Sequence, residues 1–200
     1  MLVAVVIAAV FAIGVGLVPQ FAGPGYEIAL AYGLFLPALI SLASSLELSS
    51  FEPEPFEAYC RGIANGVLVF GVAALICFGH GLVRGFCDPL SGLENLLLGP
   101  GVGAAVAGAY SAVVFELSRV FKGRRGRRAA CILLALFGPL GSIGIGLVRF
   151  YTSPMIFGYD PFVGYFSGTL YDTVIDLSRL YTYRVGSAAT LFAGFAIALH

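Results

Sequence analysis

Long apolar stretches alternate with short polar connections along most of this 200-residue chain. Five of the stretches are long enough to cross the ~30 Å hydrocarbon core of a bilayer as helices, which rise about 1.5 Å per residue. A sixth apolar stretch lies at the C-terminal end. The sequence therefore predicts about six transmembrane helices, at residues 1–18, 28–46, 63–83, 96–115, 129–148 and 180–200.

The sixth helix needs residues from the polar segment that precedes it. Residues 185–199 are apolar, but as a helix they would reach only about 22 Å. Apolar side chains recur before this stretch at helical spacing, at Leu170, Val174, Leu177 and Tyr181. We therefore expect a helix that begins near Leu170 and runs into the bilayer.

The first apolar stretch has two interpretations. A cleaved signal peptide would begin with basic residues and end at a cleavage site between small residues. Residues 1–18 show neither feature convincingly, so a retained helix is favoured and the signal peptide is the alternative.

Composition indicates that lipid is the main solvent of these helices. Hydrophobic residues make up 59% of the chain, charged residues 11%, and the mean hydropathy is +0.95. A soluble domain carries about 25% charged residues, so this chain has too little polar surface for a globule in water. The net charge of zero argues against nucleic acid as a partner. The predicted fold class is an all-α integral membrane protein, with residues 1–200 in a single polytopic domain.

One connection, between the fourth and fifth predicted spans, is strongly basic. It contains Lys122, Arg124, Arg125, Arg127 and Arg128. Such clusters remain on the cytoplasmic side during insertion, so six spans would place both termini in the cytoplasm and residues 149–184 in an extracytoplasmic interfacial segment. We expect this arrangement in a bacterial inner membrane. The same basic side chains are also candidates for binding anionic lipids.

Small residues repeat every four positions in the fourth predicted span, at Gly99, Gly103, Ala107 and Ser111. This spacing forms a nearly flat strip on one helix face, which allows two helices to approach closely in lipid. We predict a helix-packing surface there.

The predicted extracytoplasmic segment is rich in tyrosine and aspartate. Because aromatic rings favour the headgroup level of a bilayer, one interpretation is an interfacial loop or short helix on the outer ends of the helices. The alternative is a surface that binds a partner protein, a lipid or a headgroup through tyrosine rings and charged groups. The candidate residues are Tyr159, Asp160, Tyr165, Tyr171, Asp172, Asp176 and Arg179.

The acidic residues are not accompanied by a recognisable catalytic set. We find no nucleophile–base pair and no cluster with metal-ligand spacing, so the sequence nominates no catalytic residue, metal or cofactor. An enzyme is therefore less favoured than a protein without catalytic activity.

Three functional hypotheses follow. The favoured one is a structural or accessory multi-pass membrane protein, either a subunit of a larger assembly or the membrane domain of a longer chain. Its partners would be membrane lipids and other membrane subunits or further copies of itself. A small transporter or channel is the alternative, supported by Pro37 and the pair Gly138-Pro139 but lacking charged residues in mid-span. A membrane-embedded enzyme that uses the outward aspartates on a lipid-type substrate is the third.

Overall fold

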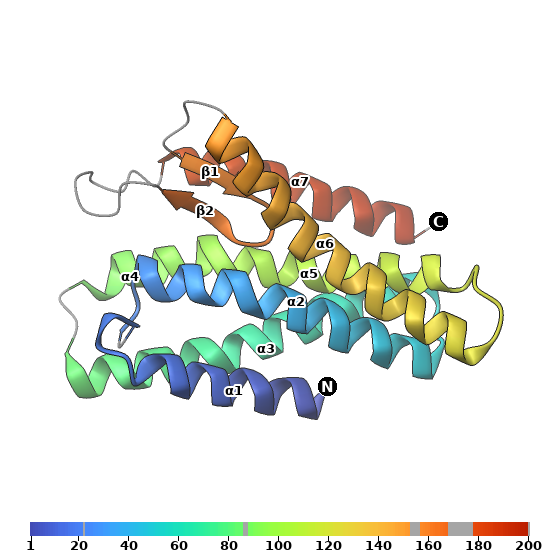
Figure 1. Cartoon of the computed structure of the whole chain (residues 1–200), viewed down its shortest axis with the longest axis horizontal. Helices are drawn as coiled ribbons and strands as arrows, with labels where there is room; N and C mark the ends of the chain where they lie inside the picture. The colour runs from blue at the N-terminus through green and yellow to red at the C-terminus, as the bar shows by residue number, and fades with distance from the viewer. Residues whose placement is uncertain (22, 86–87, 153–156, 168–177, 200) are drawn as a thin grey trace.

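The computed structural model describes residues 1–21, 23–85, 88–152, 157–167 and 178–199. Its helical elements are α1 (Leu2–Gly16), η1 (Pro19–Phe21), α2 (Tyr26–Phe51), α3 (Pro55–Arg84), α4 (Pro89–Leu96), the π-turn η2 (Leu97–Gly101), α5 (Val102–Ser118), α6 (Arg124–Thr152) and α7 (Ser178–Ala198). Two short strands, β1 (Phe157–Asp160) and β2 (Gly164–Ser167), form an antiparallel hairpin. Figure 1 shows a helical bundle with this hairpin at one end and the α5–α6 connection at the other.

Four helical segments are long and apolar enough to cross a membrane: α2, α3, the continuous segment from α4 through η2 to α5, and α6. They support the predicted helical membrane protein. Helix α1 is apolar but shorter, and α7 is not among the four, so the predicted number of six spans is not confirmed. Large apolar side chains cover the outer faces of the bundle, and Leu75, Phe137 and Phe192 are each 74% exposed. In a bilayer such side chains face lipid.

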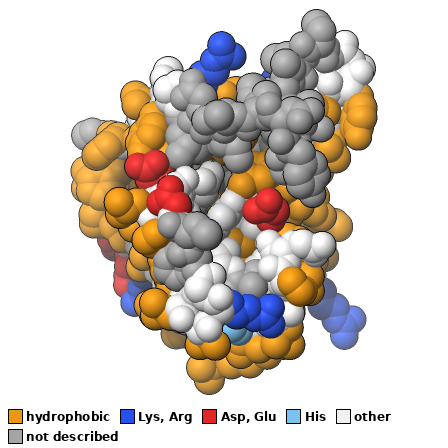
Figure 2. Space-filling view, turned by 90° about the vertical axis from the view of Figure 1, so that its left-hand side faces the viewer, with side chains coloured by type: hydrophobic (Ala, Val, Ile, Leu, Met, Phe, Trp, Pro, Cys, Tyr) orange, Lys and Arg blue, Asp and Glu red, His pale blue; other side chains and the backbone are white. Residues whose placement is uncertain are grey.

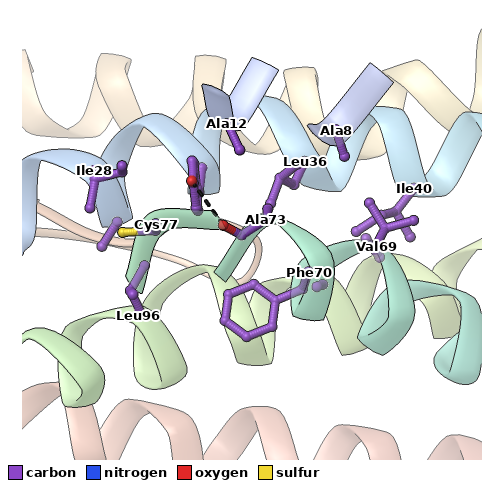
Figure 3. Packing of buried hydrophobic residues seen from close by; sticks show 14 of the residues in the cluster. Ala8, Ala12, Ile28, Leu36, Ile40, Val69, Phe70, Ala73, Cys77 and Leu96 are labelled. Carbon is purple, nitrogen blue, oxygen red and sulfur yellow. Dashed lines mark hydrogen bonds between the residues drawn. The ribbon is translucent and has the colours of Figure 1, made fainter. Parts of the chain in front are cut away.

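The main core lies where α1, α2 and α3 meet (Figure 3). Ala8 and Ala12 of α1 are fully buried, and their small side chains bring α1 close to its neighbours. Between α2 and α3, the buried Tyr32 hydroxyl donates a hydrogen bond to the carbonyl oxygen of Ala73, 3.1 Å away. This bond satisfies the polar atom that Tyr32 brings into an apolar core.

Small residues also bring α3 and α5 together. Gly62 and Gly66 of α3 face Gly108 and Ala104 of α5, and a Cβ atom on either glycine of α3 would overlap the opposite carbonyl oxygen. Close packing of this kind is a main source of helix association in lipid, where the hydrophobic effect between helices is weak. Helix α5 also contacts α2, α6 and α7, so it lies, with α2, at the centre of the described fold.

Helix α6 continues through Gly138 and Pro139 without a break. The absent side chain of Gly138 admits the ring of Tyr110 from α5, whose hydroxyl donates a 2.8 Å hydrogen bond to the carbonyl oxygen of Leu134. The glycine–proline pair therefore lies within a continuous helix and does not produce the discontinuous helix that is typical of transporters.

The segment predicted as an interfacial loop or short helix contains the β1–β2 hairpin instead. Tyr159 pairs with Tyr165 and Asp160 pairs with Gly164, which leaves a three-residue turn at 161–163. The turn begins with a proline, whose φ is fixed, and ends at Gly164, whose φ of +105° is unfavourable for other residues. Short turns of this chemistry favour a hairpin over a helix.

Candidate functional site

The hairpin turn enters the helical bundle. Phe162 and Val163 are buried between α2 and α5, where two glycines provide the space. Gly33 of α2 lies against Val163, and Gly103 of α5 lies against the carbonyl group of Phe162 so closely that a Cβ atom would overlap the oxygen. The Phe162 ring makes an edge contact with Tyr110, with 6.0 Å between the ring centroids. The hairpin is thus part of the packed interior.

Asp160 fixes the shape of the turn. Its side chain is 1% exposed, and its Oδ1 accepts hydrogen bonds from the backbone N–H groups of Phe162 and Val163, at 2.8 and 2.9 Å. Its Oδ2 accepts a hydrogen bond from the hydroxyl of Ser142. Both carboxylate oxygens are therefore used inside the chain, one on the turn and one on helix α6.

Arg184 of α7 holds the same turn from the other side. It is 5% exposed, and its Nη1 donates to the carbonyl oxygen of Pro161 at 2.7 Å. Its Nε and Nη2 donate to the carbonyl oxygens of Leu98 and Gly99 in η2, at 2.5 and 2.8 Å. Buried charges require such partners. One side chain consequently joins the hairpin, α7 and the π-turn.

Tyrosine rings pack the sides of the hairpin against its neighbours. Tyr165 contacts Tyr26 of α2, with ring centroids 5.2 Å apart, and Tyr159 contacts Tyr183 of α7 at 5.3 Å. Burial, followed by the proximity of Tyr26, raises the pKa of the Tyr165 hydroxyl, which therefore stays neutral.

The residues predicted as binding candidates fall in different places. Three contact neighbouring elements from the hairpin: Tyr159, Asp160 and Tyr165. Three others fall outside the residues that the structure describes: Tyr171, Asp172 and Asp176. Arg179 is exposed in the first turn of α7. The structure brings the hairpin residues together as internal contacts, and binding by any of the seven remains a prediction.

The predicted helix-packing strip on α5 and η2 meets two kinds of neighbour. Gly99 and Gly103 lie against the hairpin turn, and Ser111 lies near Gly62 of α3. Ala107 is fully buried. The strip accordingly accommodates the hairpin as well as a helix.

The basic residues lie at the end of the bundle far from the hairpin (Figure 1). Lys122 belongs to the connection before α6, and the others occupy the first turns of that helix: Arg124, Arg125, Arg127 and Arg128. Arg127 forms an ion pair with Glu52, which follows the last residue of α2.

The surface at the hairpin end mixes charged and apolar groups. Figure 2 shows acidic side chains towards the middle and at the left edge of this face, basic side chains at its top, its sides and its lower part, and hydrophobic side chains between them. Glu27 at the start of α2 and Glu94 of α4 are exposed. Such a surface suits the boundary between lipid and water.

Helix α7 is fastened to the bundle at a second point. The hydroxyl of Tyr59 in α3 donates a 2.6 Å hydrogen bond to the carbonyl oxygen of Leu191, and Gly194 allows the Tyr59 ring to approach. Beside this part of α7, from Thr182 to Gly194, lies a groove of about 640 Å³. Residues of α5 and α7 line it, together with Tyr59 of α3 and with Pro161 and Phe162 of the hairpin turn.

The groove is apolar. Val106 and Val113 of α5 contribute aliphatic surface, and no charged residue lines it. The hydroxyl of Thr190 donates to the carbonyl oxygen of Gly186 at 2.9 Å, and the hydroxyl of Tyr110 donates to helix α6. Because these hydroxyl groups donate their hydrogen bonds within the chain, the surface that a bound molecule would contact in the groove is mostly apolar.

Comparison of the chain with protein families, curated proteins and solved structures finds no match. Among the described residues, no group of three or more His, Cys, Asp or Glu side chains is placed to hold a metal ion.

The sequence interpretation missed Arg184, Ser142 and the hairpin turn itself. The turn has a local signature, since a proline follows Asp160 and Gly164 comes three residues after that proline, between aromatic positions. Arg184 stands as a single cation before an apolar stretch, which is a weak sign of an internal role. Nothing in the sequence around Ser142 indicated that its hydroxyl would bind Asp160.

Proposed function

We propose that this chain is an accessory membrane protein that holds a membrane lipid, with an acyl chain in the groove between α5 and α7. The groove itself supports this proposal most directly. Its volume lies within the range of about 300–1,000 Å³ that is usual for small-molecule sites, and its surface is carbon-rich. An apolar chain is the occupant that matches such walls.

The attachment of α7 explains how the groove stays open. Arg184 and the Tyr59–Leu191 hydrogen bond fasten α7 at two points that are about 10 Å apart along the helix. Between them, Gly186 has no neighbouring atom within 4 Å of a Cβ position. The helix thus bridges a space that side chains of the described residues leave unfilled.

The orientation of the protein is part of the proposal. The five basic residues of the α5–α6 region would face the cytoplasm, with both termini, and the hairpin end would face the outside of a bacterial inner membrane. As an accessory protein the chain would assemble with other membrane subunits or with further copies of itself, or form the membrane domain of a longer chain.

The state of the hairpin charges favours an accessory role over transport or catalysis. Asp160 engages both of its oxygens within the chain, and Arg184 donates to three backbone carbonyl groups. A proton-transfer group or an ion site needs an atom that is free to change partners. These two residues instead support the scaffold around the groove.

A substitution that fills the groove tests the proposal. In Gly186→Phe the new ring would occupy the groove, whereas Gly144→Phe adds the same ring to α6, where a Cβ atom also meets open space. We expect native mass spectrometry to show lipid retained by the wild-type protein and by Gly144→Phe but lost from Gly186→Phe. Equal lipid retention by all three proteins at equal thermal stability would overturn the assignment of the groove.

A further inference from the structure

A second cavity, of about 430 Å³, lies at the end of the bundle opposite the hairpin. The C-terminal end of α2, the α5–α6 connection and the first turns of α6 surround it. Four arginines line this cavity: Arg119, Arg124, Arg127 and Arg128. Glu52 is the only acid among the lining residues, so the walls carry a formal charge of +3 (four arginines and one glutamate). Lys122 and Arg125, although close in sequence, do not line it.

Phe115 positions two of these guanidinium groups. Its ring is fully buried, and the guanidinium carbons of Arg127 and Arg119 lie 5.4 and 5.8 Å from the ring centroid. Arg119 also pairs with Glu116 one turn earlier on the same helix, at 3.1 Å. Cation–π contacts of this kind hold a guanidinium group in place without using its N–H donors.

Two N–H-bearing atoms of the Arg127 guanidinium group lack a hydrogen-bond acceptor within the described residues. Its Nη1 pairs with a carboxylate oxygen of Glu52 at 2.5 Å, but its buried Nε and Nη2 atoms have no hydrogen-bond partner among the described residues. A guanidinium group presents its N–H groups as a planar fork, which matches the oxygens of a phosphate. The geometry thus provides a charge and a set of donors that the chain itself leaves incompletely satisfied.

The start of helix α6 adds to the positive potential. The helix begins at Arg124, directly after Gly123, whose φ is +86°. N–H groups at the start of a helix point outward and favour an anion there. Arg124 and Arg128 are exposed at the same place, and no ion pair of either is found within the described residues.

We infer that this cavity binds a phosphate group. The shared chemistry is a phosphate ester or phosphate ion held by Arg124, Arg127 and Arg128, and the source is either the headgroup of an anionic lipid or a soluble phosphate. The site is distinct from the α5–α7 groove and does not depend on it. It also differs from a general attraction of the basic segment to anionic lipid, because it depends on arginines that line the cavity and not on Arg125, which lies outside it.

Glu52 acts as an internal competitor in this site. Glu52 itself has a φ of +50° directly after the end of α2. Its side chain is 66% exposed although it pairs with Arg127. An incoming phosphate would take the Nη1 donor that Glu52 holds. Removing the carboxylate charge should therefore tighten phosphate binding, whereas removing an arginine of the cavity should weaken it.

The test uses the full chain, purified in detergent, with two probes. Native mass spectrometry measures retention of phosphatidic acid against an uncharged diacylglycerol, and calorimetric titration measures binding of inorganic phosphate. We expect Arg124→Ala and Arg127→Ala each to weaken binding about fivefold, while Arg125→Ala, with the same loss of charge outside the cavity, changes it less than about twofold. Glu52→Gln should increase the affinity about fivefold.

The two probes distinguish a lipid headgroup from a soluble phosphate and can also show that the cavity binds neither. Arginine-dependent binding of phosphatidic acid but not of inorganic phosphate supports a lipid headgroup, and binding of both supports a general phosphate site. Binding of inorganic phosphate alone supports a soluble ligand. Retention of neither probe, or equal losses in Arg124→Ala and Arg125→Ala, would overturn the inference. Arg124→Ala keeps the test valid if Arg127→Ala fails to fold, because Arg124 is exposed.

Discussion

Asp160 and Arg184 hold opposite polar groups of the same hairpin turn. Asp160 accepts the N–H groups of Phe162 and Val163, while Arg184 donates to the carbonyl oxygen of Pro161. Both side chains are nearly inaccessible, and no direct ion pair between them is found in the described structure. The backbone of the turn lies between the two charges, so each buried ion is compensated partly by peptide dipoles and partly by the other ion.

Replacing Arg184 with methionine should destabilise the protein strongly. The substitution leaves three carbonyl groups without their donor and removes the buried positive charge that partly compensates Asp160, whose carboxylate keeps only its hydrogen bonds to the turn and to Ser142. The expected cost is on the order of 3 kcal/mol. We expect the midpoint of thermal unfolding in detergent to fall by about 10 °C in a chain of this length.

The control for this prediction lies on the same helix. Arg179 is exposed, and Arg179→Met should change the midpoint by less than about 2 °C. Similar losses in the two variants would show that Arg184 is no more important to the fold than a surface cation.

Gly103→Val should displace the hairpin from the bundle. A side chain at this position meets the carbonyl group of Phe162, which cannot move away without withdrawing the turn from between α2 and α5. Overpacking of this kind costs about 1–3 kcal/mol. Hydrogen exchange should show faster exchange in residues 157–167.

A second glycine-to-valine substitution serves as the control, because valine lowers helix stability slightly wherever it is placed. Gly144→Val places the same side chain in α6, in open space, and should leave exchange in the hairpin unchanged. If both variants accelerate exchange in the hairpin equally, the contact between Gly103 and Phe162 does not hold the turn in place.

Cysteine labelling tests the proposed orientation. In a variant without native cysteines, a membrane-impermeant maleimide added to intact cells should modify Arg179→Cys, near the hairpin end. It should modify Gly126→Cys only after the cells are permeabilised, because the surrounding arginines would face the cytoplasm. The reverse pattern would invert the orientation of the protein and place the phosphate cavity outside the cell.

The sequence predicted the apolar helices far better than the hairpin. Predicted spans 28–46 and 63–83 fall inside α2 and α3, because unbroken apolar stretches of this length have few alternatives to a helix. The helices extend further at both ends, where polar residues continue the helix beyond the apolar stretch. Strands of four residues, in contrast, are too short to give a clear alternating pattern.

The internal role of Arg184 was not predictable from local sequence. Its shortest hydrogen bonds go to backbone carbonyl groups of residues 98, 99 and 161, and the hydroxyl of Ser187 accepts a longer one of 3.4 Å. Backbone groups leave no trace in the choice of amino acid. The groove is hidden for a similar reason, because its volume depends on how far α7 stands from α5. The cluster of arginines, in contrast, was evident at once, but which of them share a cavity was not.

The wide turn at η2 determines which face of α5 is turned towards each of its neighbours. A π-turn contains one residue more than a turn of α-helix, so everything after it is rotated by about 100° relative to a plain continuation of α4. That rotation aims Gly103 at the hairpin and, in the same helix, aims Gly108 at α3. Deleting a single residue between Leu97 and Gly101 would point both glycines elsewhere, so the length of the chain at one turn decides which neighbours α5 can meet.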